Sequence, residues 1–477
     1  MSYYEVLRPS RGWATIRERY SPGRRNEPLE RLLKIVTLHG VKSVVIEPYI
    51  DPHFRSEYSR FYATTFRPHT GMTDRLHFFT AKVPSDYTDL SQFQSDYRGY
   101  SILRPIPSNP VGRTMLTPPP ELGPGLAAIC AGEEEVHPFG WPLRVSGMPF
   151  ISSDGQYLRC AHAVQWMVLY HAYLAHGLPR RLPADIHDAS MGGAVVGRQI
   201  PSEGLSHAQI LNSLQRLELP AGRTFLPQTR NKSRNGAVIS LFSSLCRYVN
   251  SQLPPIVLSP AHARVVVGYR REEGDGPVHD RTVLYVHDDA LGPYLPVKDP
   301  WEDPFYRWGW AIPPLPARLY LNAEHAEAIG QFWIQRIART ESRAPILDAI
   351  QGGRLRFRTY AIRSASFKMG IEGRVSDDIA AEYKRLLLPG YVWVVEGVDV
   401  ALLEQRRPCV LGEVIIDTTA ENLENPGDPE MPAVLAVHVA GTAFSLRHDD
   451  VPEEDSAYMV HWPDFEPYRS GCVNGDW

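Results

Sequence analysis

Apolar residues recur along the chain with helical spacing in some segments and as strand-like runs in others. The first part has helical periodicity over 27–40, which ends in a glycine. Apolar, strand-like runs follow at 41–50, 74–83 and 97–107. A stretch with four prolines and two glycines, 117–125, then interrupts the pattern. We therefore expect a mixed α/β domain over 1–130.

The middle of the chain begins with helical patterns and ends with strand patterns. Helices are predicted over 160–176, 206–217 and 236–252. Strands are predicted at 255–259, 263–270 and 281–287. This order predicts an α+β domain over 131–321.

The last part of the chain again mixes the two patterns. A helix is predicted over 322–340 and another over 376–388, and apolar strand-like runs lie between 391 and 441. These segments predict a third domain over 322–477, which is α+β or rich in β-strands.

Composition limits the classes of partner. The 477 residues include 50 basic and 54 acidic side chains, which gives a net charge of −4 and argues against general binding to nucleic acid or to an anionic membrane. The N-terminus lacks the apolar core of a signal peptide, and no segment approaches the roughly 18 apolar residues of a membrane span. We therefore expect a cytoplasmic protein that meets its partners through local sites.

The five cysteines are odd in number, widely spaced and without a CxxC pair. Neither a disulfide framework nor a zinc site is therefore expected, and no metal or cofactor is predicted. Four of the five have no special setting and are interpreted as structural: Cys130, Cys246, Cys409 and Cys472.

Cys160 differs from the other cysteines because it stands where the polar loop "SSDGQYLR" meets a long apolar segment. The next sixteen residues contain neither proline nor glycine, and Gly177 and Pro179 then end the predicted helix. A thiol attacks as its thiolate, which a helix N-terminus and a neighbouring imidazolium both favour. Cys160 meets the first of these requirements, although a cysteine that opens an apolar helix can also be plain core packing.

A histidine and a carboxylate flank the predicted hairpin of 263–270 and 281–287. In the simplest antiparallel register Val265 pairs with Tyr285, and His262 then faces Asp288 across the open end. An acid in that place would orient the imidazole and stabilise its charged form, which completes a Cys, His, Asp triad. Asp289 and Asp299 are the alternatives for the third member.

These three segments, "CAHAVQWM", "HARVVVGY" and "YVHDDALGPY", resemble the papain-like cysteine peptidases, in particular the bacterial double-glycine-leader peptidases. The resemblance covers about 136–320. It implies a papain-like core in which the Cys160 helix packs on an antiparallel sheet. It also implies hydrolysis of a peptide bond in a specific protein or peptide substrate, in a bacterial processing or defence system. The flanking domains are large enough to bind a partner protein.

The same resemblance raises a question about the oxyanion hole. Papain-like enzymes usually carry a glutamine six residues before the cysteine, whereas this chain has Asp154 there and Gln156 four residues before. Either Gln156 stabilises the oxyanion from a shorter loop, or backbone N–H groups, including that of Cys160, form the hole.

Two other functions remain open at this stage. Transglutaminase-like proteins also use Cys, His and Asp, and often carry a motif like "GLPR" about seventeen residues after the cysteine, as at Gly177 to Arg180. The third interpretation is a catalytically inactive papain-like module that binds a peptide or a protein.

Overall fold

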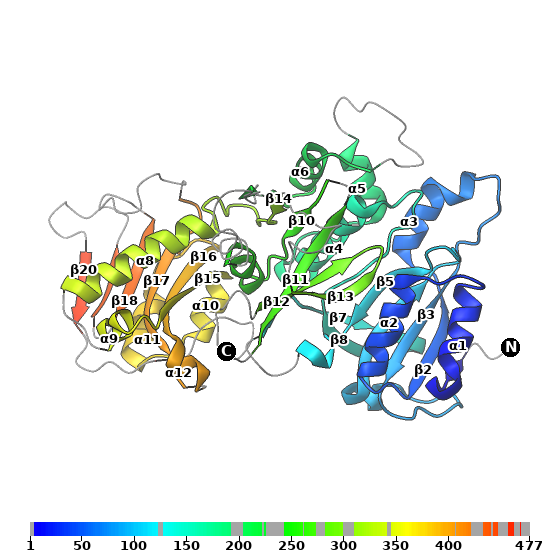
Figure 1. Cartoon of the computed structure of the whole chain (residues 1–477), viewed down its shortest axis with the longest axis horizontal. Coiled ribbons are helices and arrows are strands. Elements are labelled where there is room, and N and C mark those ends of the chain that lie inside the picture. The colour runs from blue at the N-terminus through cyan, green and yellow to red at the C-terminus, as the bar shows by residue number, and fades with distance from the viewer. Residues whose placement is uncertain are drawn as a thin grey trace. The chain divides into compact units, whose positions relative to one another are not determined.

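A computed structural model of the chain forms two compact units (Figure 1). Unit 1 comprises 1–239 and 253–316, and unit 2 comprises 240–252 and 317–477. The structure describes residues 4–122, 127–191, 204–221, 224–225, 243–260, 262–272, 282–298, 310–340, 345–405, 407–420, 433–439, 442–446, 457–461 and 468. None of the described helices is both long and apolar enough to span a membrane. The expected boundary near 130 lies inside unit 1, and the one at 321 lies close to the junction at 316.

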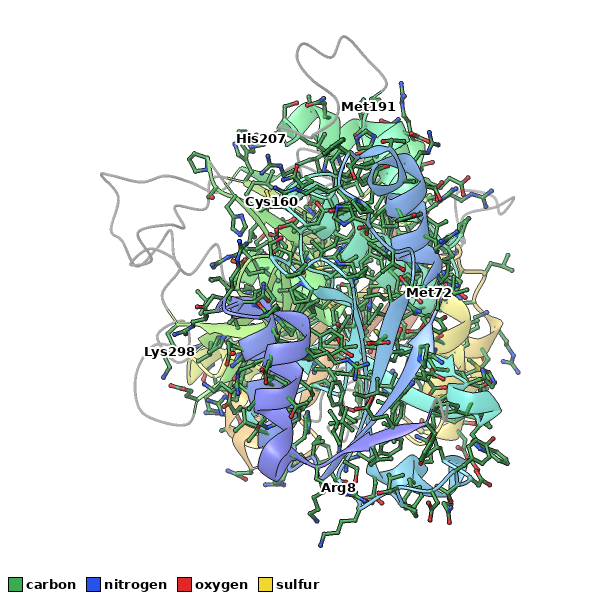
Figure 2. The ribbon with its side chains drawn as sticks, turned by 90° about the vertical axis from the view of Figure 1, so that its right-hand side faces the viewer. Arg8, Met72, Cys160, Met191, His207 and Lys298 are labelled. Atoms are coloured by element: carbon green, nitrogen blue, oxygen red, sulfur yellow. The ribbon has the colours of Figure 1, made fainter. Side chains whose placement is uncertain are left out.

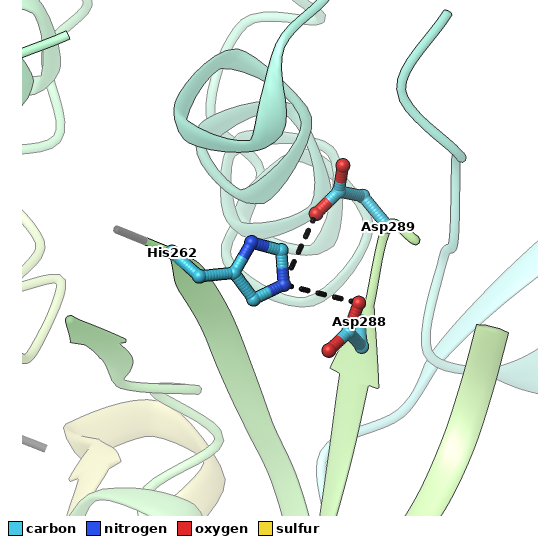
Figure 3. A group of neighbouring side chains, drawn as sticks. All are labelled: His262, Asp288 and Asp289. Atoms are coloured by element: carbon cyan, nitrogen blue, oxygen red, sulfur yellow. Dashed lines mark ion pairs between the residues drawn. The ribbon is translucent and has the colours of Figure 1, made fainter. Parts of the chain in front are cut away.

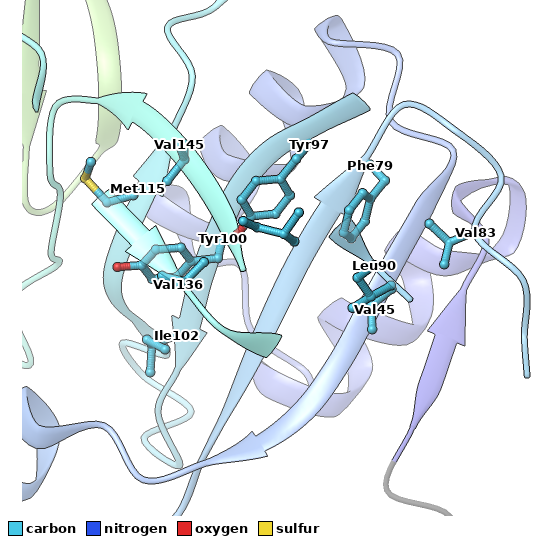
Figure 4. Close-up of a cluster of buried hydrophobic side chains, with 11 residues drawn as sticks. Val45, Phe79, Val83, Leu90, Tyr97, Tyr100, Ile102, Met115, Val136 and Val145 are labelled. Atoms are coloured by element: carbon cyan, nitrogen blue, oxygen red, sulfur yellow. The ribbon is translucent and has the colours of Figure 1, made fainter. Parts of the chain in front are cut away.

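The first sheet of unit 1 is antiparallel, with its strands in chain order. Its strands are β1 (Glu5–Leu7), β2 (Ser43–Tyr49), β3 (Thr73–Phe79), β4 (Tyr97–Leu103) and β5 (Val111–Leu116). The helices of this part are α1 (Pro9–Tyr20), α2 (Glu27–Leu38) and α3 (Pro52–Arg60). The hairpin of β7 (Gly132–Val136) and β8 (Leu143–Gly147) packs on the sheet through Val136 and Val145, which join Phe79 and Tyr100 in one buried cluster (Figure 4).

The second sheet of unit 1 is also antiparallel and supports the helix that begins at Cys160. Its strand order is β13-β12-β11-β10-β14-β9, and β6 pairs with β11. The strands are β6 (Ala127–Ile129), β9 (Thr224–Phe225), β10 (Ile256–Leu258), β11 (Ala263–Arg271), β12 (Thr282–Asp288), β13 (Gly292–Val297) and β14 (Trp310–Ile312). Helix α4 (Cys160–His176) contacts β10, β11 and β12, and α5 (Pro183–Ser190) and α6 (His207–Arg216) pack beside it. The predicted helix over 160–176 is confirmed, and residues 161–172 are all buried, which explains why the segment is apolar on most faces.

Buried polar contacts join α4 to the first sheet. On β5, Arg113 Nη1 donates to Glu134 Oε1 at 2.7 Å and to the Tyr170 hydroxyl of α4 at 3.2 Å. One turn earlier in α4, Trp166 Nε1 donates to His53 Nδ1 of α3 at 2.9 Å. Because buried polar groups are stable only when they are paired, these contacts fix α4 against the first part of the chain. That part therefore helps to hold the helix that carries Cys160.

The predicted register of the β11–β12 hairpin is wrong. Val265 pairs with His287 instead of Tyr285, and a bulge between Val266 and Gly268 shifts the ladder once more. Residues 263–269 and 282–288 are buried throughout, so no alternation of polar and apolar residues marks which face of each strand is which. When both strands are uniformly apolar, the sequence pattern does not specify which residues pair across the hairpin.

Unit 2 is built on one antiparallel sheet whose strands follow chain order. The strands are β15 (Leu355–Arg363), β16 (Tyr391–Asp399), β17 (Val410–Asp417), β18 (Val434–Val439), β19 (Thr442–Leu446) and β20 (Ala457–His461). Its helices include α8 (Ala323–Thr340), α9 (Ile346–Gln351), α10 (Ser364–Gly370), α11 (Asp377–Arg385) and α12 (Val400–Glu404), and residues 243–250 are also helical. Gly330 lets α8 approach β16, since a Cβ there would lie 2.4 Å from that of Val395. Phe367 of α10 and Tyr383 of α11 pack against Val394. The side chain of Val394 points to the face of the sheet opposite to that of Val395. Helices with antiparallel sheets in both units agree with the α+β class.

Candidate active site

Cys160 is the first residue of α4 and directly follows Arg159, whose backbone is extended; Figure 2 labels its position. The N–H groups of His162 and Ala163 bond to the Arg159 carbonyl at 3.0 and 2.9 Å. The N–H groups of Cys160 and Ala161 precede these two, in the first turn, where an α-helix has no carbonyl acceptor of its own to offer. The start of α4 thus presents backbone donors next to the thiol.

The exposure of Cys160 sets it apart from the other described cysteines. It is partly exposed, whereas Cys130, Cys246 and Cys409 are buried. Burial raises the pKa of Cys130, and it raises the pKa of Cys409 to about 11. Both therefore stay protonated and unreactive at neutral pH. The fifth cysteine, Cys472, lies outside the described residues.

The loop before Cys160 is wrapped around Asp154. Its Oδ1 accepts the N–H groups of Gln156, Tyr157 and Leu158 at 2.8, 2.9 and 2.8 Å. Its Oδ2 accepts the Tyr62 hydroxyl at 2.7 Å. Asp154 therefore serves as a structural anchor whose two oxygens are both engaged, and the side chain of Gln156 is exposed beside it. This arrangement explains how a carboxylate can stand where papain-like chains carry glutamine.

The structure brings His262 to Asp288. The imidazole stands just before β11, and its Nε2 lies 3.1 Å from Asp288 Oδ1 at the end of β12 (Figure 3). The imidazole also hydrogen-bonds to Cys160. Since Nε2 faces the carboxylate, Nδ1 is the nitrogen left for the thiol. Cys160, His262 and Asp288 therefore form a connected row, as the order of the segments in the sequence predicts.

Asp288 is held by more than the histidine. Its Oδ1 also accepts the N–H groups of Ala290 and Leu291 at 2.9 and 3.1 Å, and its Oδ2 accepts Arg264 Nε at 2.5 Å. Burial alone would raise the pKa of Asp288, but the hydrogen bond and charge of His262, together with Arg264, lower it overall. The carboxylate is therefore ionised and fixed in orientation.

Asp289 also points at the imidazole. Its Oδ1 lies 3.7 Å from His262 Nε2, and its carboxylate hydrogen-bonds to Ser153 in the loop before α4. Burial, only partly offset by the positive charge of His262, raises the pKa of Asp289 to about 6. Of the three acids considered from sequence, Asp288 is the nearest to Nε2, Asp289 is the second, and Asp299 lies outside the described residues.

These neighbours decide the charge of His262. Burial by itself would lower its pKa, but hydrogen bonds to Asp288 and Cys160 and the two carboxylate charges raise the pKa to about 10. The imidazole therefore carries a proton at neutral pH, next to the thiol. An imidazolium beside a cysteine sulfur is the arrangement that thiol nucleophiles use.

Sequence reasoning missed Arg264 and Ser153. Arg264 is 3 % exposed and is the residue that continues the observed register opposite Asp288. A charged residue inside the run "HARVVVGY" was an available signal, because buried charges are rarely left unpaired. Ser153 gave no such signal, since its role depends on how the loop folds.

The "GLPR" segment has a structural part in the fold. Gly177 ends α4 with φ of 67°, which favours glycine. Arg180 Nη2 lies 2.8 Å from His53 Nε2, and its guanidinium lies over the Tyr170 ring. These residues fasten the end of α4 to α3.

No protein-family model matches this chain, and no curated protein matches it significantly. The chemistry of the site must therefore be inferred from its own geometry.

Proposed function

We propose that this chain is a papain-like cysteine peptidase that hydrolyses a peptide bond in a specific protein or peptide substrate. The observation that carries the proposal is the row of contacts from Cys160 through His262 to Asp288. A partly exposed thiol at a helix start, hydrogen-bonded to a protonated imidazole, has the setting of a nucleophile rather than of core packing.

Each member of the row has a defined task in this mechanism. The sulfur of Cys160 attacks the carbonyl carbon of the scissile bond, and His262 gives its proton to the departing amine, which leaves a thioester. Water then attacks the thioester while His262 accepts a proton from it, and the acid product leaves as the thiol is restored. Asp288 keeps the imidazole oriented and stabilises its charge throughout.

The oxyanion of each tetrahedral intermediate needs donors near Cys160. The backbone N–H of Cys160 at the start of α4 is one candidate, and the exposed side-chain amide of Gln156 is the second. Asp154 does not compete with them, since its Oδ1 accepts backbone bonds within the loop and its Oδ2 accepts the Tyr62 hydroxyl. The two candidate donors, the Cys160 N–H and the Gln156 amide, therefore support hydrolysis in spite of the carboxylate at position 154.

The arrangement of α4 on β10, β11 and β12 supports a papain-like core, because such enzymes pack the cysteine helix on an antiparallel sheet. The transglutaminase-like alternative gains nothing from Arg180, whose contacts with His53 and Tyr170 are structural. An inactive binding module would not need the ionised, oriented Asp288 behind the histidine. Hydrolysis is therefore the function that the geometry supports best.

Selective alkylation tests this proposal. Wild-type chain is treated with limiting iodoacetamide at neutral pH, and each cysteine is quantified by peptide mass spectrometry. Cys160 should react much faster than buried Cys409, whose pKa burial raises to about 11. Because Cys160 is also more exposed, the decisive comparison is His262→Ala, which should slow the alkylation of Cys160 and leave that of Cys409 unchanged.

Product analysis separates the enzyme classes. Wild type and Cys160→Ala are incubated with a peptide library, with and without an added primary amine. New peptide ends that need Cys160 indicate hydrolysis, whereas amine adducts indicate acyl transfer. Equal alkylation of Cys160 in wild type and His262→Ala, together with no Cys160-dependent product, would refute the peptidase.

A further inference from the structure

Three potential metal ligands meet at one point of the site. His262 Nε2, Asp288 Oδ1 and Asp289 Oδ1 all lie within 4.8 Å of one another. Within the described parts of the chain, this is the one group of three or more His, Cys, Asp or Glu side chains found with such spacing. The two distances from Nε2, 3.1 and 3.7 Å, approach those between neighbouring ligands of one small cation.

Asp289 supplies an independent reason to expect a cation. The residue is 2 % exposed, and its Oδ1 accepts no hydrogen bond from any described residue. Figure 3 shows this oxygen directed at the imidazole, beside that of Asp288. A buried carboxylate oxygen that accepts no hydrogen bond costs free energy, which the charge of His262 at 3.7 Å offsets only in part, and a bound metal ion would remove that cost.

We propose that a divalent transition-metal ion of the zinc class binds to His262, Asp288 and Asp289 and reversibly blocks the thiol chemistry. One imidazole nitrogen and two carboxylate oxygens suit zinc better than magnesium or calcium, which prefer oxygen alone. No sequence pattern indicates this site, because the cysteine pattern that signals structural zinc is absent.

The blocking effect follows from the shared nitrogen and rests on the proposed function. A metal ion on Nε2 occupies the lone pair that otherwise holds a proton, and that proton is released on binding. His262 then cannot be an imidazolium beside Cys160. The ring keeps only its Nδ1 proton, and loss of that proton would leave a metal-bound imidazolate, so its donation to a leaving amine is disfavoured. Arg264 stays on the other oxygen of Asp288 and weakens the pull of that carboxylate on the metal, which favours reversible binding.

Calorimetry with zinc ion alone tests the site without any assay of activity. The full chain is stripped with a chelator and titrated with Zn²⁺, with Mg²⁺ as the comparison metal. Wild type and Cys160→Ala should each bind one zinc ion, whereas Asp289→Asn should bind it about tenfold more weakly or worse. Thermal unfolding of the metal-free variants shows whether Asp289→Asn remains folded, and Asp289→Glu, which keeps the charge, should retain zinc binding.

The opposite pattern would overturn the proposal. Absence of zinc binding by wild type refutes the site, and so does loss of binding in Cys160→Ala with full binding in Asp289→Asn, which would put the metal on the thiol. Alkylation of Cys160 adds the regulatory readout, since zinc should slow it in wild type and far less in Asp289→Asn. If Cys160 is inert even without zinc, the peptidase proposal fails while the calorimetry still decides the metal site.

Discussion

The imidazole of His262 lies 3.1 Å from the carboxylate of Asp288, although the hairpin register does not pair these two residues. Val265 pairs with His287 in the hairpin, so the next residues outward, Arg264 and Asp288, lie opposite each other. His262, two residues further out, reaches the acid with its side chain from the start of the strand. Asp288 thus receives a cationic donor on each oxygen, His262 on Oδ1 and Arg264 on Oδ2.

Replacement of Asp288 by asparagine should shift the titration of His262. Asp288 contributes to the pKa of about 10 at His262, so Asp288→Asn should move this pKa toward the ordinary value near 6.5. The alkaline limb of kcat/KM, which reports loss of the imidazole proton, should move to lower pH by the same amount. NMR titration of the His262 ring measures the shift directly and needs no substrate.

The same shift sets the pH dependence of stability. A histidine whose pKa rises from 6.5 unfolded to about 10 folded stabilises the fold fully below pH 6.5, and this contribution is lost as the pH rises through 10. Wild type should therefore lose stability over this window by more than Asp288→Asn does, as urea unfolding at both ends would measure. An unchanged His262 titration in the variant would exclude Asp288 as its electrostatic partner.

Arg264 is expected to be a positioning residue. Arg264→Met leaves the buried carboxylate of Asp288 without its closest donor, which should cost about 3–5 kcal/mol in unfolding free energy. Arg264→Lys keeps the charge and should lose less. Arg144→Met is the matched control, since that exposed arginine pairs with Glu135 on the surface and should change stability by less than about 1 kcal/mol.

A positioning role predicts more than instability. Folded Arg264→Met should show a lower kcat with little change in KM, because Asp288 no longer holds His262 in one orientation. Its His262 titration should also shift from that of wild type. A variant that is merely less stable, with an unchanged kcat and ring titration below its melting temperature, would limit Arg264 to a structural role.

The site shows which kinds of feature the sequence can reveal. Cys160 and the bounds of α4 were predictable because a long apolar run between a polar loop and Gly177 has one simple interpretation. His262 and Asp288 were predictable as strand-end residues, but the register between them was not, since both strands are buried on both faces. Contacts such as Arg113 to Tyr170 join distant segments without any periodic pattern, and so the part of the chain before 130 was not expected to hold α4.

Asp154 should resist conversion to the glutamine found in papain-like chains. If position 154 supplied the oxyanion donor, Asp154→Gln would raise kcat. Since Asp154 instead accepts three backbone N–H groups and the Tyr62 hydroxyl, we expect the variant to lose kcat and stability, the latter by about 1–3 kcal/mol. Tyr62→Phe, which removes one of these donors, should show a smaller loss. A gain of kcat in Asp154→Gln would reverse the assignment.

Gln156 provides the sharpest test of the oxyanion hole. Its side chain is exposed, so Gln156→Ala should change the unfolding free energy by less than about 0.5 kcal/mol. Loss of one oxyanion donor typically lowers kcat by about a hundredfold or more, with little effect on KM. We expect this fall in Gln156→Ala and an unchanged kcat in Gln92→Ala, an exposed glutamine in the first part of unit 1. Equal kcat in wild type and Gln156→Ala would leave the hole to backbone groups, with the N–H of Cys160 as the principal donor.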